Sequence, residues 1–441
     1  MADDEQAGGR IWSVEEHLAD VLRAVRPLEP VELSLTEAAG LVLAEDVPAV
    51  SPLPPFDNSS MDGYAVRVAD VEAATRETPA RLRVTGDIAA GAAGSPPVGP
   101  GQAVRIMTGA PLPTGADAVV PVEWTDGGTG GDQPADAMAP PAAAPAGGEV
   151  RVFRPVSLGA HVRASGSDIT PGTLALAAGT VLGPPQVGLL AAIGRARVRV
   201  RPRPRVVVMS TGSELVPPGE ALAPGQIYDA NGPMLAAAAE RAGAVVRLAP
   251  AVADDADALR GALDSCLGGA DLVLTSGGVS VGAYDVVKAA LADPATGVVF
   301  RRLAMQPGKP QGFGLTGPAG TPLFALPGNP VSAYVSFEIF VRPALRALAG
   351  YGPDALHRPR TVARLVTDGG APLTSPAGKR QFLRGSYTPP RPGERVGTVR
   401  PVGGPSSHLI GALARADVLL DIEASVTSVP SGADIAVVLL D

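Results

Sequence analysis

The stretch DLVLTSGGVSVGAYDVVK, residues 271–288, decides the fold, because an apolar run passes directly into a glycine-rich turn and then into a helical pattern. The run from Asp271 to Thr275 is typical of a short buried strand. Small residues in the turn let the backbone approach an anion before the next helix opens at Ala283: Ser276, Gly277, Gly278, Ser280 and Gly282. The stretch predicts an α/β protein with a phosphorylated ligand.

The composition narrows the class of protein. A chain of 441 residues is long enough for roughly three domains. Hydrophobic residues make up 46% but aromatic residues only 4%, so the cores must consist of Ala, Val and Leu. The net charge of -8 argues against a protein that holds nucleic acid by positive potential. An acidic protein that binds phosphate needs nearby Lys or Arg, or a divalent cation, and we expect both.

Cysteine content and the N-terminus indicate the compartment. Cys266 is the only cysteine, which excludes an intramolecular disulfide and a cysteine-based zinc site. It lies in a helical pattern, where we expect a buried, small apolar role. The acidic N-terminus lacks the apolar core of a signal peptide, and no segment holds the roughly 18 apolar residues of a membrane span. We therefore expect a cytoplasmic, soluble protein.

The periodicity divides the chain into an α/β part and several β-rich parts. Strands and helices alternate over 204–352, which predicts a doubly wound parallel sheet with ligands at the carboxyl ends of its strands. A C-terminal β-barrel is expected over 353–441. Residues 51–169 predict a β-rich domain with a flexible insertion at 126–148. The remaining segments, 12–50 and 170–203, are expected to form a discontinuous mixed linker domain that begins with a helix over 12–26. The alternative is that this helix packs on the α/β domain.

Two local signals refine this division. Ser13 and Glu16 form a capping box at the start of the first helix. The helix predicted at 330–350 is unusually apolar for a surface helix, so we expect part of it to pack against another element or subunit.

Three predicted strand ends in the α/β domain carry polar or glycine-rich turns: STGSEL at 210–215, TSGGVSVG at 275–282 and LPGNPVS at 326–332. Any one of them alone is more simply a change of chain direction. The carboxyl ends of parallel strands meet at one edge of a sheet, however, so the three turns together favour a binding site.

Charged residues near these turns are candidates for binding the ligand, and two of them, Asp285 and Lys309, also have a purely structural interpretation. Glu214 follows a strand and Asp285 lies in a first helical turn, so both could hold Mg²⁺ against a phosphate. Acidic residues in a first turn also serve simply to complement the helix dipole. Lys309 stands in the constrained loop QPGKPQG and could meet phosphate or oxyanion charge, although exposed lysines are commonly only solvated.

The β-rich region has polar loops of its own. FDNSSMDGYA at 56–65 gathers acids and hydroxyls into one turn that includes Asp62, and IMTGAPLPTGAD at 106–117 places Thr108 on another. The sequence GSD at 166–168 offers a third loop acid or a plain turn.

In order along the chain, eight motifs resemble the MoeA and gephyrin E-domain family, the molybdopterin molybdenumtransferases: FDNSSMDGYAV, RIMTGAPLPTGADAVVPVE, GSDI, STGSEL, GQIYDANG, TSGGVSVGAYDVVK, MQPGKPQGFG and LPGNPVS. The resemblance runs from about residue 12 to the C-terminus. It implies an enzyme that takes adenylylated molybdopterin and molybdate, uses Mg²⁺, releases AMP and leaves molybdenum on the dithiolene sulfurs. It also implies an elongated homodimer of four-domain subunits with a shared active site, a molybdopterin adenylyltransferase as supplier and molybdoenzymes as acceptors.

On this resemblance, residues of the chain match positions that the family uses. The catalytic set comprises Asp62, Thr108, Asp168, Glu214, Asp271, Asp285 and Lys309, with Glu214 and Asp285 holding Mg²⁺. The pterin phosphate is expected at Ser276, Gly277, Gly278, Ser280 and Gly282, together with Pro307, Gly308, Pro327, Gly328 and Asn329. Molybdate is an oxyanion that needs cationic or hydroxyl donors, and the candidates are Arg380, Arg384, Ser407 and His408. His408 has an equally good reading as a capping residue.

The chain departs from its relatives at Gln306, where many have a lysine, and at the insertion 126–148.

Two other functions compete with the enzyme. A scaffold or cofactor carrier would bind molybdopterin without turnover, and the intact acidic set argues against it. An adenylyltransferase would share the TSGGVSVG domain, but the β-rich domain and the C-terminal barrel favour metal insertion.

Overall fold

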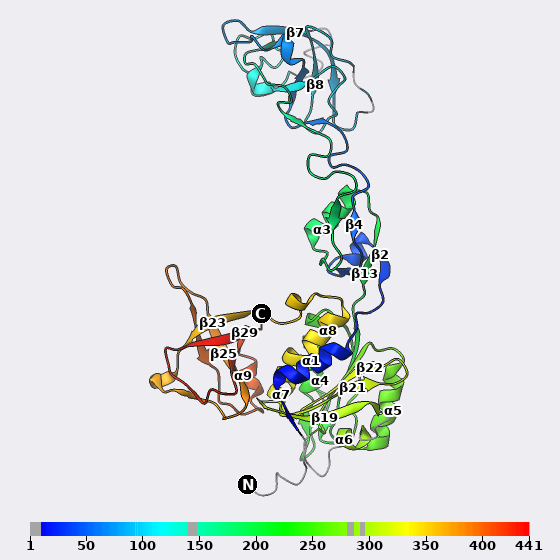
Figure 1. Ribbon diagram of the computed structural model, residues 1–441, viewed down its shortest axis with the longest axis vertical. Helices are drawn as coiled ribbons and strands as arrows, with labels where there is room; N and C mark the ends of the chain where they lie inside the picture. The colour runs from blue at the N-terminus through cyan, green and yellow to red at the C-terminus, as the bar shows by residue number, and fades with distance from the viewer. Residues whose placement is uncertain are drawn as a thin grey trace. The chain divides into compact units, whose positions relative to one another are not determined.

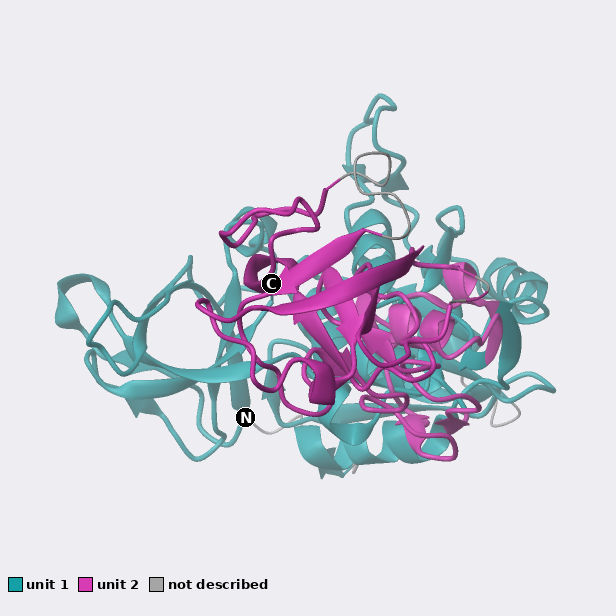
Figure 2. Cartoon of the chain, turned by 90° about the horizontal axis from the view of Figure 1, so that it is seen from above, with its two compact units in different colours: residues 1–33, 40–44, 199–441 teal, residues 34–39, 45–198 magenta. Residues whose placement is uncertain are grey.

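The computed structural model describes residues 10–92, 94, 96–139, 148–279, 286–291 and 296–440. The chain divides into two compact units (Figure 2). The larger consists of residues 1–33, 40–44 and 199–441, and the smaller of residues 34–39 and 45–198. The finer division into four domains stays a prediction. None of the described helices is long and apolar enough to cross a membrane.

The larger unit is built on a seven-stranded mixed sheet with the order β1–β19–β21–β22–β18–β14–β17. Strands β19, β21 and β22 of this sheet are labelled in Figure 1. The strands are β1 (Ile11–Trp12), β14 (Arg205–Ser210), β17 (Val245–Leu248), β18 (Leu272–Ser276), β19 (Val298–Leu303), β21 (Pro310–Thr316) and β22 (Thr321–Leu326). Strands β17, β14, β18 and β22 run parallel, as predicted. Strand β21 is antiparallel to β19 and β22, so the prediction of a wholly parallel sheet is wrong on that side. The reason is a short turn after Thr316, which joins β21 to β22 without a crossover helix.

Successive residues of the central strands face two separate cores. Val206 and Val208 of β14 pack with α1 (Val14–Ala24), α4 (Asn231–Arg241), α7 (Pro330–Ser336) and α8 (Arg342–Leu348). Val207 and Met209 pack with α5 (Ala256–Leu267) and α6 (Val286–Ala290) on the opposite face. Cys266 is buried in this second core, which confirms its predicted apolar role. Both faces of the sheet are therefore covered, which leaves its edges and strand ends for function.

The helix predicted at 330–350 forms as α7 and α8 joined by a π-helical turn, Phe337–Val341. Pro343 has no N–H to donate to the preceding turn, and a wider π turn accommodates that loss. Most of this helix is buried in the first core, which confirms that its apolar surface packs inside the protein.

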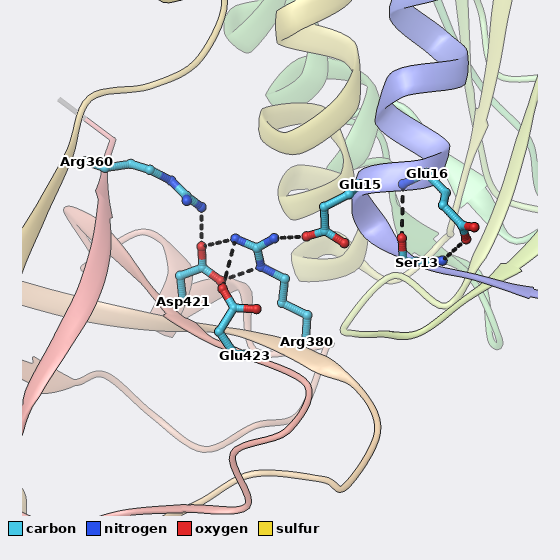
Figure 3. A network of polar contacts seen from close by, with 7 residues as sticks. All are labelled: Ser13, Glu15, Glu16, Arg360, Arg380, Asp421 and Glu423. Atoms are coloured by element: carbon cyan, nitrogen blue, oxygen red, sulfur yellow. Dashed lines mark hydrogen bonds and ion pairs between the residues drawn. The ribbon is translucent and has the colours of Figure 1, made fainter.

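The capping box at the start of α1 is confirmed. The Ser13 hydroxyl accepts from the Glu16 backbone N–H at 3.0 Å, and the Glu16 carboxylate accepts from the Ser13 backbone N–H at 2.9 Å (Figure 3). Val14 and Val21 then bury one face of α1 in the first core.

The C-terminal region closes into a five-stranded barrel, as predicted. Its strands follow the order β25 (Arg380–Thr388), β26 (Gly397–Pro401), β23 (Arg360–Leu365), β29 (Asp434–Leu439) and β27 (Val418–Ile422), and β27 pairs back onto β25. A short strand, β20 (Met305–Gln306), follows β19 of the α/β sheet along the chain and pairs with β25 of the barrel. The pairing joins the barrel to the α/β part of the unit.

A polar network also ties the barrel to α1 (Figure 3). The Arg380 guanidinium donates to both carboxylate oxygens of the buried Asp421, each at 2.7 Å, and contacts Glu15 of α1. Arg360 contacts the same Asp421 carboxylate. The hydrogen bonds to Asp421 raise the pKa of Arg380 above its ordinary value, so the guanidinium stays charged. This network is a polar link between the barrel and α1.

The smaller unit contains a five-stranded sheet with the order β10–β7–β8–β6–β9. Its strands are β6 (Gly63–Val66), β7 (Ala80–Ile88), β8 (Gln102–Ile106), β9 (Ala118–Pro121) and β10 (Glu149–Val152). Other elements are α2 (Leu35–Ala38), α3 (Pro184–Ala192) and the pairs β4 (Val47–Pro48) with β12 (Leu174–Leu176) and β5 (Asn58–Ser59) with β11 (Val162–Arg163). A three-stranded sheet whose residues belong mostly to the larger unit consists of β2 (Val31–Ser34), β13 (Arg197–Arg201) and β3 (Val42–Leu43).

The described part of the predicted insertion, 126–139, is anchored to this sheet. Asp126 is buried, and its carboxylate accepts from the backbone N–H groups of Gly128, Gly130 and Arg151 at 2.9 to 3.0 Å. Composition alone gave no sign of this anchor, because one aspartate in a polar, glycine-rich run is indistinguishable from a solvated one.

Replacement of Asp421 tests the network between barrel and helix. We expect Asp421→Ala to lower the free energy of unfolding by about 3 kcal/mol, because it leaves the mostly buried Arg380 without its carboxylate. Asp434→Ala is the matched control, since the pair of Asp434 with Arg364 is half exposed and contributes less than about 0.5 kcal/mol. Urea unfolding of both variants gives the comparison, and equal losses would contradict a stabilising role for the network.

Candidate functional site

The three motif-bearing turns of the α/β domain meet at one sheet edge. Ser210 of β14 is paired with Ser276 of β18, which is paired with Leu326 of β22. Beyond these ends, the Thr211 N–H donates to the Ser276 carbonyl at 2.9 Å and the Gly277 N–H donates to the Leu326 carbonyl at 3.1 Å. The predicted convergence is therefore confirmed.

A pocket of about 740 Å³ opens at this edge. Its lining contains eight of the residues named from the sequence: Glu214, Ser276, Gly277, Gly278, Pro327, Gly328, Asn329 and His408. All of these lie in the larger unit. A volume in this range suits a small organic ligand rather than a single phosphate group.

Two glycines of the turn are required by the close approach of neighbouring backbone. Gly277 has φ +107°, and a Cβ atom there would lie 2.4 Å from the Thr211 carbonyl oxygen. Gly278 has φ +61°, and its Cβ atom would lie 2.9 Å from a methyl group of Val287. Any side chain at these positions would clash and strain the backbone, so the turn can lie against the ends of β14 and α6 only with glycine.

The segment 229–232, before and at the start of α4, holds the strand ends together, and the sequence analysis assigned it no role. The Asp229 carboxylate accepts from the Ser210 hydroxyl and the Gly232 N–H, both at 2.9 Å. The Asn231 amide donates to the Ser276 hydroxyl at 2.9 Å and to the Gly328 carbonyl at 2.6 Å. The signal was present in the motif GQIYDANG, whose acid and amide directly precede a helix.

Three of the described acidic residues line the pocket, and the two exposed ones, Glu214 and Asp254, form its acidic rim, whereas Asp229 is half-buried. The Asp254 carboxylate accepts from the Ser213 N–H at 3.0 Å, while Glu214 is exposed. Within the described ranges, no group of three or more His, Cys, Asp or Glu side chains is placed to hold a metal ion. Asp285, Ser280 and Gly282 lie outside the described residues, so the expected Mg²⁺ pair of Glu214 and Asp285 stays a prediction.

The PGK loop reaches the same edge, because β19 runs in the direction of β22. Lys309 is exposed there, directly before the pocket-lining Pro310. Pro307 and Gly308 are buried beneath, and the Gln311 amide donates to the Gly308 carbonyl at 2.7 Å. These two residues support the loop and do not line the pocket.

Asp271 is not brought to the pocket. It precedes β18, so it lies at the amino end of the strand, whereas the pocket lies at the carboxyl end. Its carboxylate pairs with the Arg205 guanidinium at 2.8 and 3.0 Å and accepts from the Arg205 backbone N–H. Burial raises the pKa of the Asp271 carboxyl, but these hydrogen bonds from Arg205 outweigh it and lower the pKa overall. The structure places Asp271 in a structural ion pair and Asp254 at the site.

Of the four molybdate candidates, the two arginines are held in contacts away from the pocket, whereas the loop of Ser407 and His408 reaches it. The guanidinium of Arg380 is held in the network with Asp421, and that of the buried Arg384 donates to the carbonyls of Gly404 and Ser406. Neither arginine lines the pocket. The Ser407 carbonyl accepts from the Val331 N–H at 3.0 Å, which holds this loop against α7 and brings His408 to the lining.

Two of the three polar loops of the smaller unit, those of Asp62 and Thr108, are joined by hydrogen bonds. The Asp62 carboxylate accepts from both the backbone N–H and the hydroxyl of Thr108, at 2.6 and 2.8 Å. The loop 166–168 pairs with a neighbouring segment, since the Asp168 N–H donates to the Leu53 carbonyl at 3.0 Å. The structure therefore joins Asp62 to Thr108.

These features define a modular protein with a pocket lined by a glycine-rich turn on an α/β domain, a β-rich unit and a C-terminal barrel. Three family models match the chain: "MoeA N-terminal region (domain I and II)" over residues 12–194, "Probable molybdopterin binding domain" over 207–347 and "MoeA C-terminal region (domain IV)" over 370–440. The chain belongs to the MoeA family, as its motifs indicated.

Individual relatives match over almost the whole chain. It is 46% identical to molybdopterin molybdenumtransferase 2 of Mycobacterium tuberculosis over 96% of this chain and 98% of that protein. Identity to molybdopterin molybdenumtransferase 1 of the same organism is 39%, over 97% and 99% of the two chains. A solved structure of a molybdopterin biosynthesis MoeA protein from Pyrococcus horikoshii matches with a TM-score of 0.77 and 31% identity, over 98% of this chain and 100% of that chain.

Replacement of Asp271 distinguishes its structural role from a catalytic one. We expect Asp271→Asn to lower the free energy of unfolding at pH 7 by at most about 1 kcal/mol, because the Arg205 side chain is 60% exposed and solvent weakens the pair. The pKa of Asp271 is lowered by folding, so its contribution exists above the unfolded pKa and is lost as the pH falls through the folded pKa. The gap between variant and wild type should therefore close below about pH 4.

Denaturant unfolding from pH 7 to pH 2 measures this gap, and isothermal titration with AMP checks the pocket in the same variant. Unchanged stability together with a tenfold loss of AMP affinity would indicate instead that Asp271 belongs to the binding site.

Proposed function

We propose that this chain is a molybdopterin molybdenumtransferase, which inserts molybdenum from molybdate into adenylylated molybdopterin with Mg²⁺-dependent release of AMP. The observation that carries the proposal is the convergence of three family motifs at one pocket of about 740 Å³. The named relatives over nearly the full chain support it.

The phosphate end of the substrate is assigned to the turn after β18. Backbone N–H groups of a glycine turn attract an anion at close range, and Gly277 and Gly278 allow that approach. The Ser276 hydroxyl is oriented by the Asn231 amide and by the Pro327 carbonyl, to which it donates at 3.3 Å. Lys309 supplies positive charge where negative charge builds on the phosphoryl oxygens.

The acidic rim suits a hard cation. Carboxylate oxygens are the ligands that Mg²⁺ prefers, and Glu214 is exposed at the pocket with Asp285 as its proposed partner. When bound there, Mg²⁺ would neutralise phosphate charge. The protein's own acids would orient the water or molybdate oxygen that attacks phosphorus, so that the P–O bond of the phosphoanhydride breaks and AMP leaves.

Molybdate is assigned to the loop that contacts α7. Ser407 and His408 are its proposed donors, because the Ser407 carbonyl binds Val331 and His408 lines the pocket. Arg384 acts through the loop, since its guanidinium holds the carbonyls of Gly404 and Ser406. Arg380 is assigned to the network between barrel and helix.

We also propose that the enzyme is a homodimer with a shared site. Asp62, Thr108 and Asp168 match family motifs but lie in the smaller unit, which lacks the phosphate-binding turns. In this proposal they complete the pocket of the other subunit, and residues 12–50 and 170–203 take part in dimerisation. A cytoplasmic location, a molybdopterin adenylyltransferase as supplier and molybdoenzymes as acceptors belong to the same proposal.

Product analysis tests the reaction. With adenylylated molybdopterin, Mg²⁺ and molybdate, the purified protein should release AMP and form molybdenum-bearing cofactor, measured by chromatography and metal analysis. We expect Glu214→Gln to lower the rate at limiting Mg²⁺ by about tenfold, because one oxygen ligand loses its charge. The control is Asp434→Ala, remote from the pocket lining. AMP release that does not depend on molybdate would contradict the proposed insertion.

Complementation tests the shared site. We expect Asp62→Ala and Asp285→Ala proteins to be separately inactive and to regain activity when refolded together, because a mixed dimer holds one pocket with neither substitution. A tag on each variant shows how much mixed dimer forms. Inactive mixed dimers at the statistical proportion would place both residues in a single-chain site.

A further inference from the structure

The pocket lining is of two chemical kinds. Ser276, Gly277 and Gly328 provide hydroxyl and backbone groups, which we call the polar side, whereas Leu215, Ile227 and Tyr228 contribute large apolar surfaces, which we call the apolar side. Phosphate needs only the polar side. The apolar side must therefore face a different part of the ligand, since apolar surface is left in contact with water only at a cost in free energy.

The apolar side is built on the pair β15 (Leu215–Val216) and β16 (Ile227–Tyr228). Ile227 remains 54% exposed and Tyr228 45% exposed, although both line the pocket. Tyr228 is the one phenol ring among the described lining residues, in a chain with only 4% aromatic residues. Because aromatic residues are scarce here, an exposed ring at a pocket indicates recognition rather than core packing.

The Tyr228 ring is also held in place. Its hydroxyl donates to the Glu220 carbonyl at 2.9 Å, which restrains the ring against the connecting loop. The next residue, Asp229, is anchored to Ser210, and Asn231 is anchored to Ser276 of the phosphate-binding turn. The ring thus keeps a fixed place relative to the turn, as recognition of a rigid ligand requires.

We propose that Tyr228, with Ile227 beside it, stacks on a planar nitrogen heterocycle of the ligand while the glycine turn binds the phosphate joined to that heterocycle. This inference rests on the proposed function, because adenylylated molybdopterin has such a heterocycle at each end, adenine and pterin. The ring face is tolerant of ring identity, since every such heterocycle has a π face. Titration with each half of the substrate decides which end Tyr228 binds.

The structural alternative is that Tyr228 only holds the 217–226 loop through its hydroxyl. Two substitutions separate the readings. Tyr228→Phe removes the hydrogen bond to Glu220 and keeps the ring, whereas Tyr228→Leu removes both. Leu222→Ala is the matched control, because Leu222 is an exposed apolar residue of the same loop that does not line the pocket.

The experiment is isothermal titration of the full-length protein and these variants with AMP and, separately, with molybdopterin. For the ligand that stacks, we expect Tyr228→Leu to weaken binding about tenfold, and Tyr228→Phe and Leu222→Ala to stay within about twofold of wild type. Tyr228→Trp supplies a spectroscopic readout, because a stacked heterocycle should quench its added fluorescence at saturation.

The outcomes distinguish this inference from the proposed function. Wild-type affinity of Tyr228→Leu for both ligands, equal losses in Tyr228→Phe and Tyr228→Leu, or unquenched fluorescence at saturation would each overturn stacking and leave molybdate-dependent AMP release untouched. A wild-type protein that binds neither ligand would overturn stacking together with the proposed function. Stacking with active turnover confirmed separately would support both.

Discussion

The register between β14, β18 and β22 is the constraint on which the site depends. It sets Ser210, Ser276 and Leu326 side by side, so the three turns that follow must share one small volume. At Gly277 the backbone lies so close to the Thr211 carbonyl that a Cβ atom would be 2.4 Å from it. Neither parallel pairing nor glycine alone makes an anion site, but together they bring several backbone groups to one place.

The barrel contributes to the same pocket through its attachment. Strand β20 pairs with β25, Arg380 joins Asp421 to Glu15, and the Ser407 carbonyl binds the start of α7. A buried ion pair adds less stability than its charges suggest, because both ions lose hydration. Its clearer effect is orientation, since Arg380 must lie between Asp421 and Glu15 to contact both. The Ser407–Val331 hydrogen bond then holds the His408 loop at the lining.

The sequence predicted the features that depend on local pattern. The capping box at Ser13, the buried Cys266 and the convergence of the three turns follow from short-range rules. Strand direction alone would have excluded Asp271, because the residue before a strand lies at its amino end. Asp254 was not predicted at the site, because the turn after β17 contains no glycine. Strand β21 was not predicted either, because the glycines of PQGFGLT are untypical of a strand. The buried partners of Arg380 and Arg384 are far away in sequence or are backbone carbonyls, which no pattern reveals.

An acidic protein can bind an anionic ligand because hydrogen-bond donors close to the ligand attract it, although the net charge of the protein repels it at long range. Long-range attraction is unfavourable at a net charge of -8, and surface charges are screened beyond about 10 Å. Backbone N–H groups act only within hydrogen-bond distance, so their strength depends on the close fit that Gly277 and Gly278 permit. Because Gln306 is neutral, the loop at this edge presents the positive charge of Lys309. In the proposed function, affinity for the anionic ligand comes from the fit of the turn, from Lys309 and from a cation held at the acidic rim, which would account for acids beside an anion site.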